Sequence, residues 1–149
     1  MSLEQDVQIL TKIPLLAGLE AEALRLLAFS AEKLTLAKDE ILFRRDETSD
    51  CGYVLMAGAL LISVEDSNLT VSAPALVGEL ALIVATNRTS DATALQPSLV
   101  MKVPRHLFLR VLREFPAGAG RLRTFLSQSL LEFTLSLDDA RNRADARVP

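Results

Sequence analysis

The sequence Gly-Glu-Leu-Ala-Leu-Ile-Val-Ala-Thr-Asn-Arg-Thr-Ser-Asp, residues 78–91, decides how the rest of the chain is interpreted. Gly78 allows the backbone to approach a ligand closely. The apolar helical turn or two predicted after it would leave unpaired N–H groups at the positive end of the helix dipole. A helix start of this kind has the features of an anion-binding site. Arg88 can bring a planar cation to the same anion, and Thr89 and Ser90 can add hydroxyl donors.

A carboxylate in this segment is unexpected for a simple phosphate site. Glu79 directly follows Gly78, and two negative charges repel each other. The carboxylate is explained if it accepts a hydrogen bond from a neighbouring hydroxyl group, such as the 2′-hydroxyl of a ribose. Glu79 and Arg88 together are therefore compatible with a ligand whose phosphate lies beside a sugar.

The segment closely resembles the phosphate-binding cassette of the cyclic nucleotide-binding domain family. The family pattern is roughly Gly-Glu-(Leu/Ile)-Ala-Leu, a short spacer, and Arg-(Thr/Ala/Ser)-(Ala/Ser), and residues 78–82 and 88–90 fit it. The resemblance implies that Arg88 holds the cyclic phosphate of cyclic AMP or cyclic GMP and that Glu79 holds the ribose hydroxyl. The ligand-binding residues that it implies are Gly78, Glu79, Leu80, Ala81, Arg88, Thr89 and Ser90. It implies a bound ligand, with no cofactor and no metal.

Two interpretations of the segment lead to different functions. In the first, the protein is a cyclic nucleotide sensor, and the Arg88 side chain must lie close to the amides that follow Gly78. In the second, Arg88 is a surface cation and Glu79 only favours the helix dipole. The fold would then be a degenerate one that serves as a protein-interaction or dimerisation module without a ligand.

Composition bounds the class of protein. The chain has 149 residues, half of them hydrophobic, which is enough for one domain with a sizeable core. A net charge of −3 argues against a general nucleic-acid binder, so no direct DNA binding is expected. The single Cys51 cannot form an internal disulfide, and no run of about 18 apolar residues could span a membrane. Without a signal-peptide pattern, these features predict a cytoplasmic protein.

Residues with catalytic potential are few. A metal-binding cupin, the enzyme class with the most similar barrel, needs several histidines, whereas this chain has only His106, predicted at the surface. Cys51 is interpreted as a small packed residue. No nucleophile elbow or nucleotide-binding glycine loop of an enzyme occurs. The chain is therefore not expected to be an enzyme.

The hydrophobic period divides the chain into three parts. Residues 1–30 have helical spacing, residues 31–103 have the short alternating runs of strands, and residues 104–141 return to helical spacing. Regularly spaced strands without alternating helices predict a sandwich or jelly roll. The resemblance specifies one domain, residues 1–149: a jelly-roll β-barrel that contains the cassette, residues 78–91, with helices on either side. The strands expected are residues 33–36, 41–43, 53–56, 60–64, 69–72, 92–95 and 99–103.

The helical ends carry their own predictions. The first part predicts helices over residues 4–16, interrupted by Pro14, and over residues 20–29. The third part predicts a helix over residues 105–114 and a last helix over residues 121–140. Pro116, Gly118 and Gly120 lie between these two helices and predict a hinge.

The last helix is the predicted partner surface. One apolar stripe runs along it: Leu122, Phe125, Leu126, Leu130, Phe133 and Leu137. The stripe is broad enough to cover the β-roll, to cap a nucleotide base, or to bind a second subunit or another protein. No helix-turn-helix, transmembrane or kinase domain accompanies these parts, so a free-standing module is expected.

Overall fold

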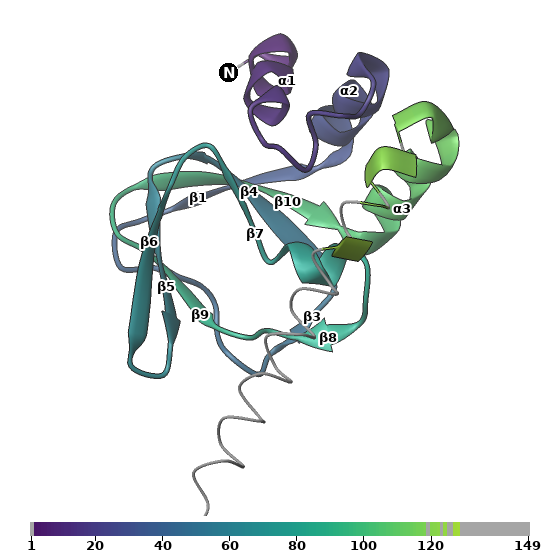
Figure 1. Ribbon diagram of the computed structural model, residues 1–149. Helices are drawn as coiled ribbons and strands as arrows, with labels where there is room; N and C mark the ends of the chain where they lie inside the picture. The colour runs from purple at the N-terminus through teal and green to yellow at the C-terminus, as the bar shows by residue number, and fades with distance from the viewer. Residues whose placement is uncertain (1, 119, 123, 125–126, 129–149) are drawn as a thin grey trace, which may run out of the picture.

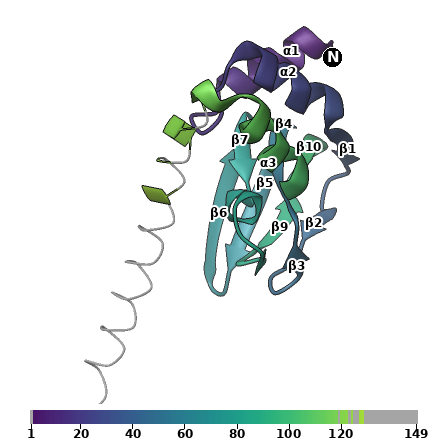
Figure 2. The ribbon, with the colours of Figure 1, turned by 90° about the vertical axis from the view of Figure 1, so that its right-hand side faces the viewer.

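The computed structural model describes residues 2–118, 120–122, 124 and 127–128 (Figure 1). A β-roll forms the body of the molecule, and the helices gather at one end of it (Figure 2). A mainly β fold with flanking helices is thereby confirmed. Most of the predicted last helix, residues 121–140, and most of its apolar stripe lie outside the described residues.

Two short helices begin the chain, α1 (Leu3–Thr11) and α2 (Ala21–Ser30). A capping box starts α1: the Ser2 side chain accepts from the backbone N–H of Gln5, and the Gln5 side chain accepts from the N–H of Ser2. The helix predicted over residues 4–16 is too long, because α1 ends at Thr11 and turns follow. Pro14 lacks an N–H and disfavours helical backbone before it, which explains the early end.

The β-roll consists of two four-stranded antiparallel sheets and one two-stranded ladder. The first sheet has the order β1 (Glu32–Leu36), β10 (Ser98–Pro104), β4 (Cys51–Ala57) and β7 (Ala75–Val77). The second has the order β2 (Ile41–Phe43), β9 (Asp91–Ala94), β5 (Ala59–Val64) and β6 (Ser67–Ser72). The two sheets do not close into a barrel, so the expected barrel is in fact a roll of separate sheets.

Two apolar clusters hold the roll together. Buried side chains of both sheets, among them Leu55, Leu60 and Val100, pack between the sheets. The outer face of the first sheet is covered by the helices, whose Leu10 and Leu27 join one cluster with Met101 of β10. Burial of each such side chain contributes about 1.5–3 kcal/mol. The helices are thus part of the core of the fold.

Three strands were not expected from the sequence. Thr48–Ser49 (β3) pairs with Thr86–Asn87 (β8), although both segments have the composition of polar turns. Their backbone groups bond to each other across a long stretch of chain, which a local pattern does not reveal. The third, β7, is a three-residue strand at the edge of the first sheet.

Helix α3 (Arg105–Glu114) has the predicted bounds. It also buries the predicted apolar face, Leu107, Phe108, Val111 and Leu112. The backbone leaves the helical conformation at Phe115, directly before Pro116, and residues 116–118 are helical again. Gly118 is packed against Gly18 and donates its N–H to the Glu20 side chain at 2.8 Å. This junction therefore lies against the segment between α1 and α2, and its role as a hinge stays a prediction.

Candidate ligand-binding site

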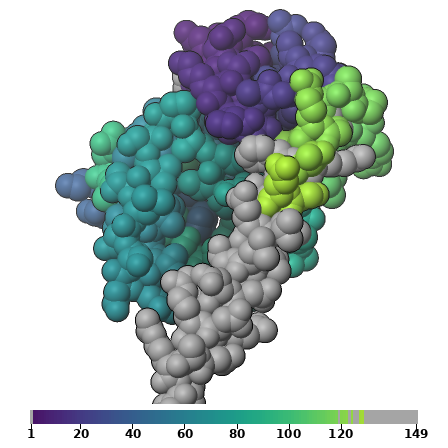
Figure 3. All heavy atoms as spheres, in the orientation of Figure 1, coloured from purple at the N-terminus to yellow at the C-terminus, as the bar shows by residue number. Residues whose placement is uncertain are grey.

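A cavity of about 370 Å³ opens in the β-roll between the two sheets and a short 3₁₀ helix, η1 (Glu79–Leu82). In the space-filling view, the β-roll lies below the helices α1, α2 and α3 (Figure 3). All seven residues predicted to bind a ligand line this one cavity: Gly78, Glu79, Leu80, Ala81, Arg88, Thr89 and Ser90. Folding therefore brings together the two halves of the predicted cassette.

Gly78 forms the tight turn from β7 into η1. Its backbone is left-handed, with φ 70° and ψ 30°, which glycine adopts without strain. Any side chain at this position would also collide with Nη1 of Arg88. The helical turn or two expected here is a single four-residue 3₁₀ helix, so its dipole is short. The close approach of Arg88, more than a helix dipole, gives this turn its positive character.

Arg88 is a buried cation. The residue follows β8 and is only 7 % exposed, and its Nη2 donates to the Cys51 carbonyl oxygen at 2.8 Å and contacts the Cys51 sulfur at 3.3 Å. Within the described residues, Nη1 has no hydrogen-bond partner and no carboxylate forms an ion pair with Arg88. The side chain thus presents an unsatisfied donor to the cavity.

Two aromatic rings form a platform under the guanidinium group. The Arg88 Cζ atom lies 4.4 Å from the ring centre of Phe43 and 5.5 Å from that of Tyr53. The two rings are themselves stacked, with centroids 6.1 Å apart. Such cation–π contacts stabilise a cation by about 0.5–2 kcal/mol. Phe43 and Tyr53 therefore fix the plane in which Arg88 meets a ligand.

The aromatic platform supplies no negative charge. Burial raises the pKa of the Tyr53 phenol, with further contributions from Cys51, although the positive charge of Arg88 lowers it. The phenol therefore stays neutral throughout the physiological pH range. Cys51, predicted as a packed residue, is buried at the start of β4. Tyr53 therefore provides no counterion for Arg88.

The remaining predicted residues divide between the rim and the floor. Glu79 and Thr89 are exposed, whereas Ala81 and Ser90 are buried and Leu80 is half-buried. The buried Ser90, which lines the same cavity as Arg88, can supply a hydroxyl donor. The carboxylate of Glu79 stays in water at the rim, where it is available to a hydroxyl group of a ligand.

Sequence reasoning did not identify the apolar wall of the cavity. It consists of half-buried or exposed side chains from the second sheet and the end of the first: Ile62, Leu69, Val71 and Leu76. Leu69 is 63 % exposed on β6. The alternation of Leu69 and Val71 places both on one face of that strand and was the available signal. The cavity thus has a cationic end and an aliphatic side.

Groups suited to other chemistry are absent from the part of the chain that the structure describes. No cluster of three metal-ligating side chains occurs there. His106 is exposed on α3, as predicted. Among the same residues, no helix combines the length and the apolar character needed to cross a bilayer. The lining of the cavity is suited to an anion that carries an apolar part.

The comparison with known families assigns this architecture. Residues 33–115, more than half of the chain, match the family described as the cyclic nucleotide-binding domain. The chain belongs to the cyclic nucleotide-binding domain family. The matched segment of this cyclic nucleotide-binding domain includes η1 and Arg88, so the resemblance stated from the cassette is confirmed.

Individual relatives cover different shares of the domain. A cyclic nucleotide-binding-like protein from Brucella abortus is 36 % identical, with a TM-score of 0.64 over 72 % of this chain and 97 % of that chain. The regulatory domain of Toxoplasma gondii PKA, solved with cAMP, is 21 % identical, with a TM-score of 0.67 over 73 % of this chain and 44 % of that chain. Neuropathy target esterase sws of Drosophila grimshawi is 27 % identical over 109 residues, 69 % of this chain, and the chain spans about 7 % of its length.

Proposed function

We propose that this domain binds a cyclic nucleotide, cyclic AMP or cyclic GMP, and acts as a small-molecule sensor. Arg88 would hold the cyclic phosphate, Glu79 would accept from the ribose hydroxyl, and the amides of Glu79 and Leu80 with the hydroxyls of Thr89 and Ser90 would complete the site. One observation carries the proposal: Nη1 of Arg88 is buried at the cavity without a partner among the described residues. We infer a regulatory binding module and not an enzyme.

The energetics of a buried guanidinium favour an anionic ligand. A charge removed from water without a counterion is costly, and a site that holds one is stabilised when an opposite charge arrives. A cyclic phosphate carries one negative charge and acceptor oxygens, which match the planar donors of arginine. A hydrogen bond to a charged group contributes about 1.5–3 kcal/mol. Arg88 therefore supplies a large part of the proposed affinity.

The shape of the cavity supports the same class of ligand. Its volume of about 370 Å³ lies within the range of roughly 300–1,000 Å³ of small-molecule pockets. Arg88, Ser90, Leu69 and Val71 all line the cavity, so the first two would hold the phosphate while the last two would form an apolar wall beside the base. The PKA regulatory domain of Toxoplasma gondii, which shares the fold, was solved with cAMP, and this supports a cyclic nucleotide as the ligand.

Calorimetric titration with cyclic AMP and with cyclic GMP tests the proposal. The variant Arg88→Ala should bind the preferred nucleotide about ten- to hundredfold more weakly, because it loses a hydrogen-bonded charge contact. Arg110→Ala is the matched control, since Arg110 is an exposed arginine of α3 that does not line the cavity. Equal affinity of the Arg88 variant and the wild type would refute the assigned role.

A module without a ligand is the competing function. That interpretation expected Arg88 as a surface cation, and its burial favours the sensor instead. A thermal-shift assay separates the two, because a ligand that binds the folded state raises the melting temperature. No shift with saturating cyclic AMP or cyclic GMP would favour the interaction module.

The output of the sensor rests on the chain after α3. We propose that the last helix caps the bound base and that its apolar stripe contacts a second subunit or a partner protein. Binding would then change which face of this helix is available, because the two states differ in their contacts. The absence of direct DNA binding and the cytoplasmic location stay predictions.

A further inference from the structure

We propose that Arg105, the first residue of α3, is a positioning residue that holds the anion site in its binding geometry. Its role rests on the proposed function, since the site in question is that of the cyclic phosphate. Arg105 does not line the described cavity. Its side chain contacts the backbone of η1 and of the segments beside Arg88, and among the described residues it forms no hydrogen bond with a side chain that lines the cavity.

The Arg105 side chain joins η1 to β3. Its Nε donates to the carbonyl oxygen of Ala81 at 2.7 Å, and its Nη2 donates to those of Ser49 at 2.8 Å and Val84 at 3.0 Å. The first and last of these acceptors belong to the segment that runs from η1 toward Arg88, and the second belongs to β3. Three acceptors on two segments meet one guanidinium group.

The two arginines also share one strip of backbone. Three consecutive carbonyls accept from them: Ser49 from the Arg105 side chain, Asp50 from the Arg105 backbone N–H at 2.7 Å, and Cys51 from Nη2 of Arg88. The position of the acceptor that orients Arg88 is thus fixed, one residue away, by Arg105. A shift of this strip would turn the Arg88 guanidinium out of register with Gly78.

A second connection runs through Thr86. The Ser49 hydroxyl donates to the carbonyl oxygen of Thr86 at 2.6 Å, and β3 pairs with β8 just before Arg88. Arg105 holds β3 from one side, and β8 follows β3 through this pairing. The carbonyl group of Cys51, which accepts from Arg88, and the backbone of Arg88 itself are therefore both held in place through Arg105.

The location of Arg105 in α3 is unfavourable for the helix itself. A cation in the first turn opposes the helix dipole, and the first turn of α3 contains no acidic residue. A lysine could not replace it, because one ammonium group cannot reach three carbonyls with a planar fork. The stability of α3 does not explain this arginine, whereas its three carbonyl contacts do.

The test compares Arg105→Met with Arg110→Met. The first variant removes all side-chain donors and keeps much of the apolar stem. The second removes an exposed arginine of the same helix whose one ion-pair partner among the described residues is Glu114. In the ligand-free full chain, hydrogen exchange followed by mass spectrometry should become faster in residues 79–88 for Arg105→Met and stay unchanged for Arg110→Met. Calorimetry with cyclic AMP and cyclic GMP should show an affinity about tenfold lower for Arg105→Met only.

Further variants separate positioning from a general loss of stability. Arg105→Lys keeps the charge and should still show the faster local exchange, which also covers the case in which Arg105→Met does not fold. In the double variant with Arg88→Lys, the affinity losses should be less than additive, because both changes act on one site. Wild-type exchange and affinity in both Arg105 variants would overturn the proposal. So would faster exchange spread equally over all elements.

The two proposals can fail separately. If the wild type binds neither cyclic nucleotide, the proposed function is wrong. The exchange of residues 79–88 in the ligand-free variants then still decides whether Arg105 holds the geometry of this segment.

Discussion

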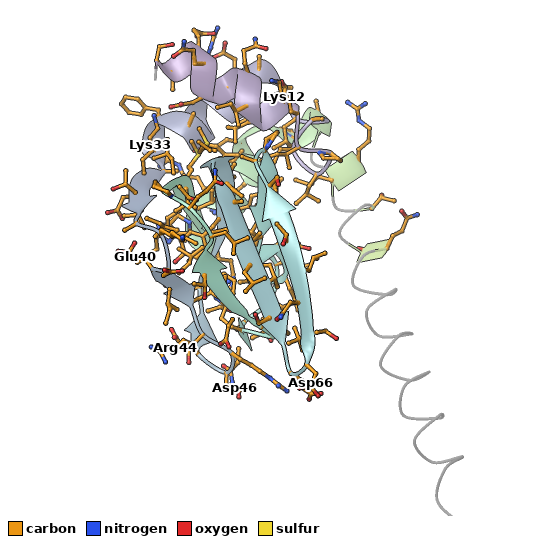
Figure 4. The ribbon with its side chains drawn as sticks, turned by 90° about the vertical axis from the view of Figure 1, so that its left-hand side faces the viewer. Lys12, Lys33, Glu40, Arg44, Asp46 and Asp66 are labelled. Carbon is orange, nitrogen blue, oxygen red and sulfur yellow. The ribbon has the colours of Figure 1, made fainter. Side chains whose placement is uncertain are left out.

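Two charged side chains are buried among the described residues, on opposite faces of the first sheet, and their partners differ. Asp6 of α1 is 2 % exposed and forms an ion pair with Lys33 of β1, at the edge of the roll below the helices (Figure 4). Arg88 is 7 % exposed and has no carboxylate partner among the described residues. The first pair fixes α1 to the sheet. The second charge has no counterion among the described residues, and the proposed binding site rests on this difference.

The largest effect is expected on the paired side. Lys33→Met should lower the free energy of unfolding by about 2–3 kcal/mol, because it leaves the Asp6 carboxylate buried alone. This is less than the roughly 3–5 kcal/mol of a fully buried pair, since the Lys33 side chain is 33 % exposed. Arg88→Met, measured without ligand, should cost clearly less because no counterion is left behind. Denaturant unfolding of both variants provides the comparison.

A double variant sharpens this result. Asp6→Leu combined with Lys33→Met should recover most of the lost stability, because no charge then remains buried. Two results would show that the distinction between the paired and the unpaired charge is wrong. One is a free energy of unfolding for Lys33→Met within about 0.5 kcal/mol of the wild-type value. The other is a larger loss of stability in Arg88→Met than in Lys33→Met.

The aromatic platform gives a smaller expected effect. Phe43→Leu keeps an apolar side chain but removes the ring below Arg88, and it should weaken binding of the preferred cyclic nucleotide by about 1 kcal/mol. Tyr53→Phe keeps the second ring and should bind as tightly as the wild type. Calorimetric titration measures both. Unchanged affinity in Phe43→Leu would show that the ring does not orient the arginine.

The smallest effect concerns alkaline pH. Because burial raises the pKa of Tyr53 above its ordinary value of 10.0, the unfolded chain releases this proton at lower pH than the folded protein. The neutral phenol therefore makes its full contribution to the free energy of unfolding below about pH 10, and this contribution is lost as the pH rises above that value. Tyr53→Phe should lose less stability than the wild type between about pH 9 and 11. Thermal unfolding can be followed across this pH range. If the melting temperatures of the wild type and of Tyr53→Phe fall in parallel, the raised pKa of Tyr53 is contradicted.

The fold could be predicted where the signal was local. The apolar face of α3 follows from helical spacing within ten residues, and the structure buries the predicted set. The ladder between Thr48–Ser49 and Thr86–Asn87 could not be predicted, because its pairing joins polar segments that are far apart in sequence. The separation of the roll into two sheets likewise depends on register and not on local pattern.

The candidate site shows the same division. Gly78 and Arg88 were identified because they lie in one short segment with a characteristic spacing, and the structure places them in contact. Phe43 and Arg105 were missed, since they reach the site only through the packing of distant strands and the start of α3. The only local signal was a cation in the first turn of a predicted helix, which is unfavourable for the helix and indicates that Arg105 makes contacts elsewhere.

The contact between Gly78 and Arg88 constrains how this sequence can change over evolution. Any side chain at residue 78 occupies the space of the Arg88 guanidinium. A substitution at residue 78 must therefore move the guanidinium group away from its place beside the turn, and it also strains a backbone with φ 70°. Among related chains, loss of Arg88 should therefore accompany replacement of this glycine more often than retention of the arginine does.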